Sequence, residues 1–303
     1  MTEAPTHNTA LGAWIAVVFA GLAWALYLEN GDWPAAYHHD EPSKVEQIQE
    51  SYRNLNHPLL LLETTDLLGA AGDDGTVILR RGRLVSAFCM VLAVGALVMA
   101  ATRRHSWMAG LFVGGVSILY FRFYEVGHYF KEDTPFLLGL ALVMWAVSER
   151  MRAQNSTTAV MLGLAAGFAM SSKYAGVGMF AIVLPVAILY REGSHKRTVA
   201  LVLAAALGMF LLVHARFLFI GNPFQVLSSS VTQEVTWLVH GHKGIGTEIP
   251  SWDYAERLRF DLGYHGLALL ALWVVFFRRL TKADAVLLLF GVTFFIILTM
   301  SRK

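Results

Sequence analysis

About nine apolar runs, each long enough or nearly long enough to cross a bilayer, constrain the fold of this chain most. The first, Ala10 to Leu28, has about nineteen residues, and a hydrocarbon core of roughly 30 Å needs about twenty helical residues. The other runs are Leu84–Thr102, Ser106–Tyr124, Thr134–Ser148, Thr157–Ser171, Val177–Tyr190, Val199–Leu212, Tyr264–Phe277 and Ala283–Met300. They predict an all-α, multi-pass transmembrane helical bundle with about nine spans.

Composition supports an integral membrane protein and excludes two other classes. Hydrophobic residues make up 56% of the chain and charged residues only 15%, against roughly 25% charged in soluble domains. The net charge of +2 is too small to indicate a nucleic-acid partner. The single cysteine, Cys89, lies in an apolar run, so neither a disulfide framework nor a thiolate metal site is expected.

The basic residues predict the orientation of the bundle. Groups of Lys and Arg fall in every second connection, at Arg103/Arg104, Arg150/Arg152, Arg191/Lys196/Arg197 and Arg278/Arg279/Lys282. By the positive-inside rule these connections and the N-terminus are cytoplasmic. The loops 29–83, 125–133 and 221–261 then lie outside. We expect 1–303 to form a single transmembrane module, in which loop 29–83 carries amphipathic helices at the interface.

Two acidic clusters fall on the predicted outer side. The first is "YHHDEPSKVEQI", which contains Asp40 and Glu41, and the second is "KEDTP", which contains Asp133. Helix capping is one interpretation of both, with Asp40 or Glu41 as the first cap. In the second cluster Thr134 would be the cap and Pro135 the first helical residue. That interpretation leaves Asp133 unexplained.

A lysine sits at a third outward turn, in "MSSKYAG". The run before Lys173 spans about fifteen residues and rises only about 22 Å, less than the hydrocarbon core. Lys173 is therefore expected at or below the outer surface. A lysine at that depth either snorkels to water or meets an anion.

The order of "HHDEP", "NHP", "EDTP" and "SSKYAG" along the chain resembles the GT-C fold membrane glycosyltransferases. The nearest branch contains polyprenyl-phosphate-dependent enzymes such as protein O-mannosyltransferases and aminoarabinose transferases. The resemblance extends over about residues 10–260. It implies transfer of a sugar from a polyprenyl-phosphate donor to a protein, lipid or glycan acceptor on the outer, extracytoplasmic face of a bacterial or archaeal membrane.

The resemblance also implies roles for four residues. Asp40 matches the catalytic base and Glu41 its companion in the "DE" pair, while Asp133 matches the second acid. Lys173 matches the lysine of the "SKY" turn. Such chemistry needs a carboxylate to accept the proton of a poor hydroxyl nucleophile, and direct displacement is expected to invert the anomeric centre.

The departing lipid phosphate needs positive charge beside it. Lys173, Lys243 in "HGHKGIG" and Arg257 in "AERLRF" can supply it, and a divalent metal ion is the alternative cofactor. The metal-ligand candidates are Asp40, Asp133, His240 and His242, although solvated histidines are the simpler interpretation of the "HH" and "HGH" pairs.

Two other classes remain as alternatives. A membrane transporter would use the outer acids as a gate, but transporters built from repeats carry ionisable groups near midplane and show internal repeats. A non-catalytic membrane assembly subunit would leave the acids without a role. Relatives continue beyond the last run, so the resemblance implies a fragment or a short variant.

Overall fold

The computed structural model describes residues 9–216, apart from 30, 34–37, 54, 56, 70–71 and 192, and a few single positions beyond 216. The chain divides into two compact units, Met1–Gly221 and Asn222–Lys303, and the helices below belong to the first. Every regular element in the described residues is a helix, which confirms the all-α expectation. The expected spans Tyr264–Phe277 and Ala283–Met300 and the loop 221–261 lie essentially outside this part.

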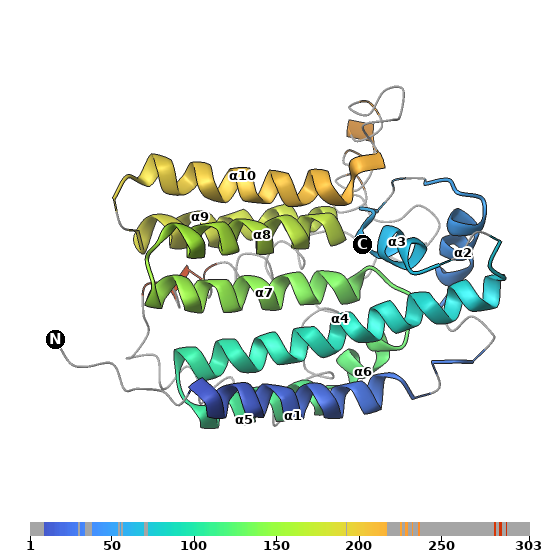
Figure 1. Cartoon of the computed structure of the whole chain (residues 1–303), viewed down its shortest axis with the longest axis horizontal. Coiled ribbons are helices and arrows are strands. Elements are labelled where there is room, and N and C mark those ends of the chain that lie inside the picture. Colours follow the sequence, from blue (N-terminus) through green and yellow to red (C-terminus); the bar gives the residue numbers. More distant parts are fainter. Residues whose placement is uncertain are drawn as a thin grey trace. The chain divides into compact units, whose positions relative to one another are not determined.

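Long apolar helices run alongside one another in the first unit (Figure 1). Those that can cross a membrane are Ala10–Tyr27 in α1 (Thr9–Tyr27), α4 (Gly75–Arg104) and α10 (His195–Val213). A fourth span is possible if α5 (Trp107–Leu119) and α6 (Phe121–Gly127) cross together. The chain is therefore a multi-pass membrane protein, with three or four candidate spans in the described part. The remaining elements of the bundle are α7 (Asp133–Arg152), α8 (Ser156–Ser172), the 3₁₀ turn η1 (Tyr174–Met179) and α9 (Phe180–Leu189).

The loop predicted at 29–83 contains three helical segments among its described residues. It contains α2 (Glu41–Gln49) and α3 (Leu60–Leu67), as the sequence indicates, and α4 already begins inside it at Gly75. The Asp74 side chain caps α4 by accepting a hydrogen bond from the Thr76 amide. Two arginines of the charged first turns of α4 pair with acids, Arg81 with Asp73 at 2.6 Å and Arg83 with Glu41 at 2.8 Å. Arg80 donates to the Asp32 carbonyl at 2.9 Å. Apolarity alone cannot reveal such a helical extension.

The run Ser106–Tyr124, expected as one span, is two helices. They meet at Tyr120 and are bent by 62°. The start of the next helix also differs from the capping interpretation. α7 begins at Asp133, and the Thr134 hydroxyl donates to the Lys131 carbonyl at 3.0 Å. The expected Thr134 cap is therefore wrong.

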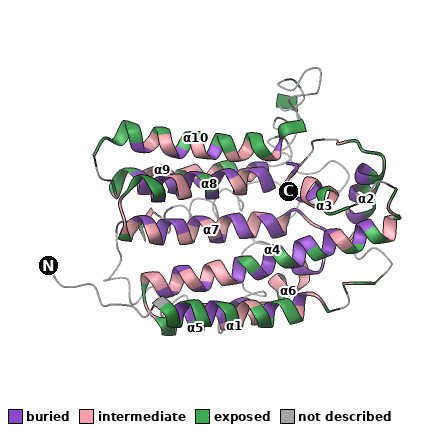
Figure 2. Cartoon of the chain, viewed as in Figure 1, coloured by how far each residue is buried: buried purple, intermediate pink, exposed green. Residues whose placement is uncertain are grey.

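Small residues bring the central helices into close contact, and buried residues recur along α7 and α8 (Figure 2). A Cβ placed on Gly139 of α7 would lie 2.6 Å from the Ala169 Cα of α8. A Cβ on Gly167 of α8 would lie 2.5 Å from the Ala206 carbonyl oxygen of α10. Such close approach drives helix association where lipid removes the hydrophobic contribution. It also holds the ends of α7 and α8 in register.

Candidate active site

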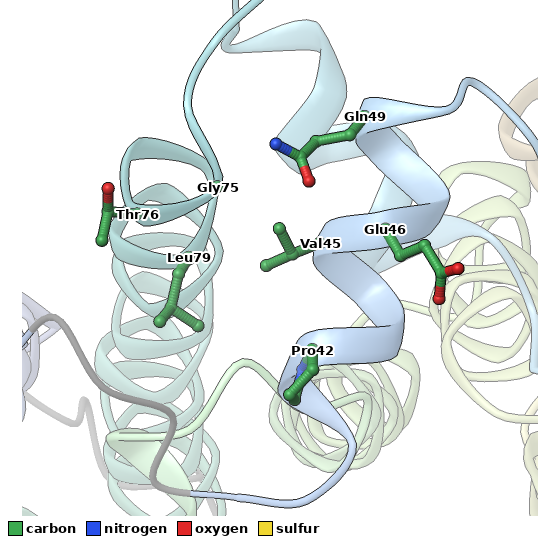
Figure 3. A pocket seen from close by; sticks show the side chains of 7 residues that line it. All are labelled: Pro42, Val45, Glu46, Gln49, Gly75, Thr76 and Leu79. Atoms are coloured by element: carbon green, nitrogen blue, oxygen red, sulfur yellow. The ribbon is translucent and has the colours of Figure 1, made fainter.

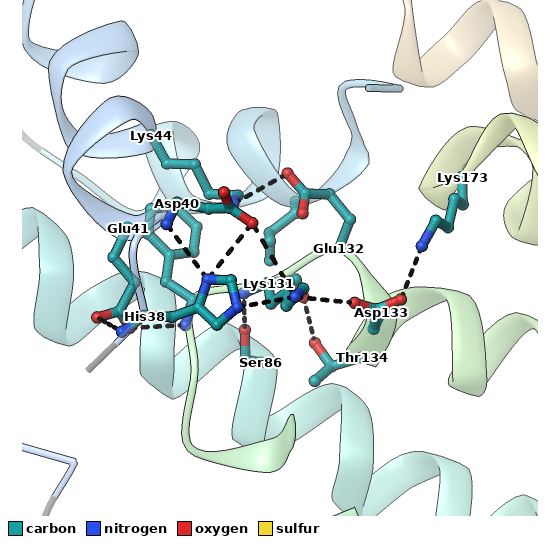
Figure 4. A network of polar contacts seen from close by, with 12 residues as sticks. His38, Asp40, Glu41, Lys44, Ser86, Lys131, Glu132, Asp133, Thr134 and Lys173 are labelled. Atoms are coloured by element: carbon teal, nitrogen blue, oxygen red, sulfur yellow. Dashed lines mark hydrogen bonds and ion pairs between the residues drawn. The ribbon is translucent and has the colours of Figure 1, made fainter. Parts of the chain in front are cut away.

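Four charged residues meet at the end of the bundle where α4 and α7 begin (Figure 4). Asp40 immediately precedes α2, Asp133 is the first residue of α7, and Lys173 follows the last residue of α8. Lys131 lies in the connection between α6 and α7. The two acids and Lys173 are therefore positioned by three helix ends, the starts of α2 and α7 and the end of α8.

Asp40 occupies the N-cap position of α2, but its side chain makes no capping hydrogen bond. Its carboxylate instead faces two imidazoles, with Oδ1 3.1 Å from His39 Nε2 and Oδ2 3.4 Å from His38 Nδ1. Asp40 is 39% exposed at its side chain, so an external molecule can reach it. The capping interpretation explains where this residue lies and not what its carboxylate does.

Lys131 stands between the two acids. Its Nζ lies 4.0 Å from Asp40 Oδ2 and 3.8 Å from Asp133 Oδ2. The two carboxylate oxygens can be no farther apart than the sum of these distances, which is less than the roughly 10 Å over which two groups can act on one substrate through a bridging water or ion. Lys131 Nζ also lies 2.9 Å from His38 Nε2. Burial, and then the charge of Lys131, lower the pKa of His38.

Lys173 pairs with Asp133, and the Nζ to Oδ1 distance is 2.9 Å. Asp133 is therefore shared by two lysines, and positive and negative groups alternate from Asp40 through Lys131 and Asp133 to Lys173. The Lys173 side chain is 33% exposed. It does not simply snorkel to water, since a carboxylate holds its ammonium.

Two ion pairs are buried directly beneath this row of charges. Glu41 is fully buried and its oxygens lie 3.0 and 2.8 Å from the guanidinium of Arg83, which is 2% exposed. Glu132 lies 3.2 Å from Lys44, and both side chains are less than a tenth exposed. These pairs join α2 to α4 and to the α6–α7 connection, so they fix the segments that carry Asp40 and Lys131.

Glu41 is held in its ionised form. Burial raises its pKa, but the Arg83 guanidinium and the amides of Phe130 and His38, which donate to its oxygens, lower the pKa further than burial raises it. A carboxylate with all these donors has little capacity left for a substrate proton. Its contacts tie the start of α2 to α4 and to the α6–α7 connection.

Two cavities lie near the charges. An apolar one of about 440 Å³ is lined by α1, α3, α4, α7 and α8, with Leu61, Phe88, Pro135 and Phe168 among its walls. Pro135 follows Asp133 by two residues, so the cavity begins within one helical turn of the second acid. The other, of about 280 Å³, lies between α2 and the start of α4 and includes Glu46, Gln49 and Thr76 (Figure 3).

Several expected site residues lie outside the described part of the chain: Lys243, Arg257, His240 and His242. The sequence predicts roles for Asp40, Glu41, Asp133 and Lys173, which the structure brings together, and predicts none for Lys131 or Arg83. For His38 in the "HH" pair, metal binding is one interpretation of the sequence and solvation is the simpler one. The only sequence signal for Lys131 is its place in "KEDTP", next to Glu132 and Asp133. Among described residues, His38, His39 and Asp40 form the group with metal-ligand spacing, and Asp133 is not part of it.

Residues 75–217 match the family model described as dolichyl-phosphate-mannose-protein mannosyltransferase. One similar solved structure is ArnT from Cupriavidus metallidurans bound to undecaprenyl phosphate, with a TM-score of 0.68 and 17% sequence identity. The match covers 95% of this chain and 56% of the ArnT chain. Another is the S. cerevisiae protein O-mannosyltransferase Pmt1-Pmt2 complex bound to the sugar donor, with a TM-score of 0.54 and 17% sequence identity. That match covers 86% of this chain and 38% of the yeast chain. No curated protein sequence matches this chain.

The helical bundle and these two structures define the class, which is a multi-pass membrane protein with the GT-C glycosyltransferase fold. The family match covers just under half of the chain, in the same helical part, and it agrees with the fold of these two structures. The resemblance inferred from the sequence is thereby confirmed. The chain spans about half of the ArnT structure and a smaller share of the yeast one.

Proposed function

We propose that this protein transfers a sugar from a polyprenyl-phosphate donor to an acceptor hydroxyl at the outer face of the membrane, with Asp40 as the general base. The observation that carries the proposal is the row of alternating charges Asp40, Lys131, Asp133 and Lys173, which lies beside an apolar cavity at one end of the bundle.

Asp40 suits the role of base because it is accessible and its carboxylate is not used for capping. It accepts the proton of the acceptor hydroxyl as the new glycosidic bond forms at the anomeric carbon. The bond from that carbon to the phosphate oxygen breaks, and the lipid phosphate leaves with the electron pair. Attack opposite the leaving group inverts the anomeric centre.

Among the residues that the structure describes, Lys173 and Lys131 are the proposed ligands of the leaving phosphate. Both are partly exposed and both already bind a carboxylate oxygen, at 2.9 Å for Lys173 and 3.8 Å for Lys131. A phosphate group can replace Asp133 as the partner of either ammonium without leaving a charge unpaired. Asp133 then serves as the resting counter-ion that keeps these lysines in place.

The apolar cavity is the proposed site for the first isoprene units of the donor. Its lining is almost wholly hydrophobic, from Trp24 on α1 to Phe168 on α8. A lipid carrier keeps its tail in the bilayer, so its phosphate arrives at about headgroup depth. The cavity is lined in part by α3 and by Pro135, two residues after Asp133, so a tail bound there would adjoin a phosphate held by Lys173.

The test uses the purified protein and a panel of labelled polyprenyl-phosphate sugars, with release of the lipid phosphate as the readout. Asp40→Asn should abolish transfer and leave donor binding nearly unchanged, because Asn retains the shape and loses the base. Glu50→Gln, an exposed residue at the end of the same short helix, is the matched control and should remain active. Full activity of Asp40→Asn would remove Asp40 from the mechanism.

A further inference from the structure

Three consecutive residues at the mouth of the site have the composition of a metal site. The side chains of His38, His39 and Asp40 each offer one ligand atom, and these atoms lie within 4.8 Å of one another. The two imidazole rings stack with their centroids 4.2 Å apart. Each Asp40 oxygen faces a different ring, at 3.4 Å from His38 Nδ1 and 3.1 Å from His39 Nε2.

We propose that His38, His39 and Asp40 bind a divalent transition-metal ion such as zinc, and that the bound ion inhibits transfer by occupying Asp40. The binding part stands on the geometry of these three residues. The inhibitory part rests on the proposed function, in which Asp40 is the base.

The spacing fits a small ion with nitrogen and oxygen ligands. Zinc binds imidazole nitrogen and carboxylate oxygen at about 2.0 to 2.2 Å, so two ligands on a tetrahedral ion lie about 3.3 Å apart. The two imidazole-to-carboxylate distances, 3.4 and 3.1 Å, match that separation. Imidazole ligands select zinc, copper or nickel over calcium or magnesium. His39 is 83% exposed, so an ion can enter from solvent, and water can complete the coordination.

Lys131 competes with the ion. Its Nζ lies 2.9 Å from His38 Nε2, and the Asp40 amide nitrogen lies 3.2 Å from His38 Nδ1, so both ring nitrogens already have partners. A metal on Nδ1 replaces the amide contact and requires the ring proton on Nε2. An ammonium can only donate, so Lys131 must then move away. The positive charge of Lys131 also repels a dication at this distance.

The consequence for transfer follows from the lone pairs of Asp40. A carboxylate that coordinates a metal ion cannot accept a proton with the same oxygen, and Asp40 has its two oxygens turned toward the two imidazoles. An ion held there neutralises the base. Zinc would therefore act as a reversible inhibitor that competes with deprotonation of the acceptor.

The binding experiment needs no activity. Metal-free protein in detergent is titrated with zinc against a chromogenic chelator. His39→Ala should bind one zinc fewer, or bind it at least about tenfold more weakly, and its exposed side chain makes misfolding an improbable cause. His195→Ala, which alters another exposed histidine, is the matched control and should bind like the unaltered protein. Lys131→Gln should bind zinc about threefold or more tightly.

Transfer is then measured for each variant against zinc, relative to its own zinc-free rate. The unaltered protein should be inhibited and restored by EDTA, and His39→Ala should need at least about tenfold more zinc. Unchanged zinc binding in His39→Ala would overturn the site. Zinc that binds at the site without inhibition would overturn the inhibitory role. Absence of transfer from every donor, with zinc binding as expected, would instead contradict the proposed function.

Discussion

Individual charges in the candidate site fall into two groups with different expected roles. Glu41, Arg83, Lys44 and Glu132 are buried and paired, and removing one of a buried pair leaves a charge in a medium that cannot solvate it. Asp40, Lys131, Asp133 and Lys173 are each between a quarter and two fifths exposed at the side chain. We expect the first group to control folding and the second group to control chemistry.

The Lys173 ammonium is predicted to bind the donor phosphate. Lys173→Met should weaken donor binding by about 1.5 to 3 kcal/mol, the range for hydrogen bonds to charged groups. Lys173→Arg should weaken it less, because the positive charge remains. Equilibrium binding of a labelled polyprenyl-phosphate sugar measures both. Unchanged binding in a folded Lys173→Met protein would favour Lys131 as the phosphate ligand instead.

The Glu41–Arg83 pair is predicted to show strong coupling. Arg83→Met alone should lower stability by about 3 to 5 kcal/mol, because it leaves the fully buried Glu41 carboxylate uncompensated. The double variant Arg83→Met/Glu41→Gln should lose less, since the orphaned charge is gone. Thermal unfolding in detergent compares the two. Additive losses would mean that the pair is not coupled.

Helix contacts determine where the site residues end up. The α8–α10 and α7–α8 contacts are formed by glycine and alanine, and α3 is joined to the end of α10 through His214. These contacts hold α3 over the apolar cavity and hold Lys173 opposite Asp133.

Gly167→Ala is predicted to separate α8 from α10. The added Cβ would lie 2.5 Å from a backbone oxygen of α10, which cannot move independently of its helix, so a loss of about 1 to 3 kcal/mol is expected. Gly95→Ala makes the same change in α4 where nothing lies within 4 Å, and it should be nearly neutral. Equal melting temperatures for the two variants would contradict this packing.

His214 is predicted to make stability depend on pH. The Leu59 amide donates to its Nε2 at 3.2 Å, its Nδ1 lies 2.9 Å from the Phe210 carbonyl, and burial lowers its pKa from 6.5 to about 4. Between these values the unfolded chain binds a proton that the folded chain does not, so stability falls as pH decreases from 6.5 toward 4. The loss is on the order of 2 kcal/mol at pH 5. In His214→Gln the melting temperature should change less between pH 7 and pH 5 than in the unaltered protein. An unchanged dependence on pH would mean that other groups cause it.

The two ends of the helical bundle in the first unit carry different charged residues. The acids and lysines of the site gather where α4 and α7 begin, and Arg103, Arg104, Arg150 and Arg152 lie at the ends of the same two helices. Acids at a helix end, instead of midplane, suit a site that works on a lipid headgroup better than an ion pathway.

The orientation of the membrane protein is predicted from this asymmetry. Single cysteines at Ser43 and Ser156, both exposed, are introduced in a Cys89→Ser background and treated with an impermeant thiol reagent on intact cells. The first should be labelled from outside and the second only after permeabilisation. The reverse pattern would invert the proposed topology.

Local properties of the sequence determined the class of the protein, the positions of most helices and the placement of Asp40 and Asp133 at one end. Hydropathy, run length and the alternation of basic connections act within single segments, so they are visible without a fold. Only the tertiary structure decided that Lys131 lies between the two acids, that Glu41 is bound by Arg83, and that α5 and α6 break at Tyr120. Each depends on side chains from separate helices meeting, as Glu41 and Arg83 do across 42 positions. Such a meeting depends on how separate helices pack against one another, which no single segment encodes.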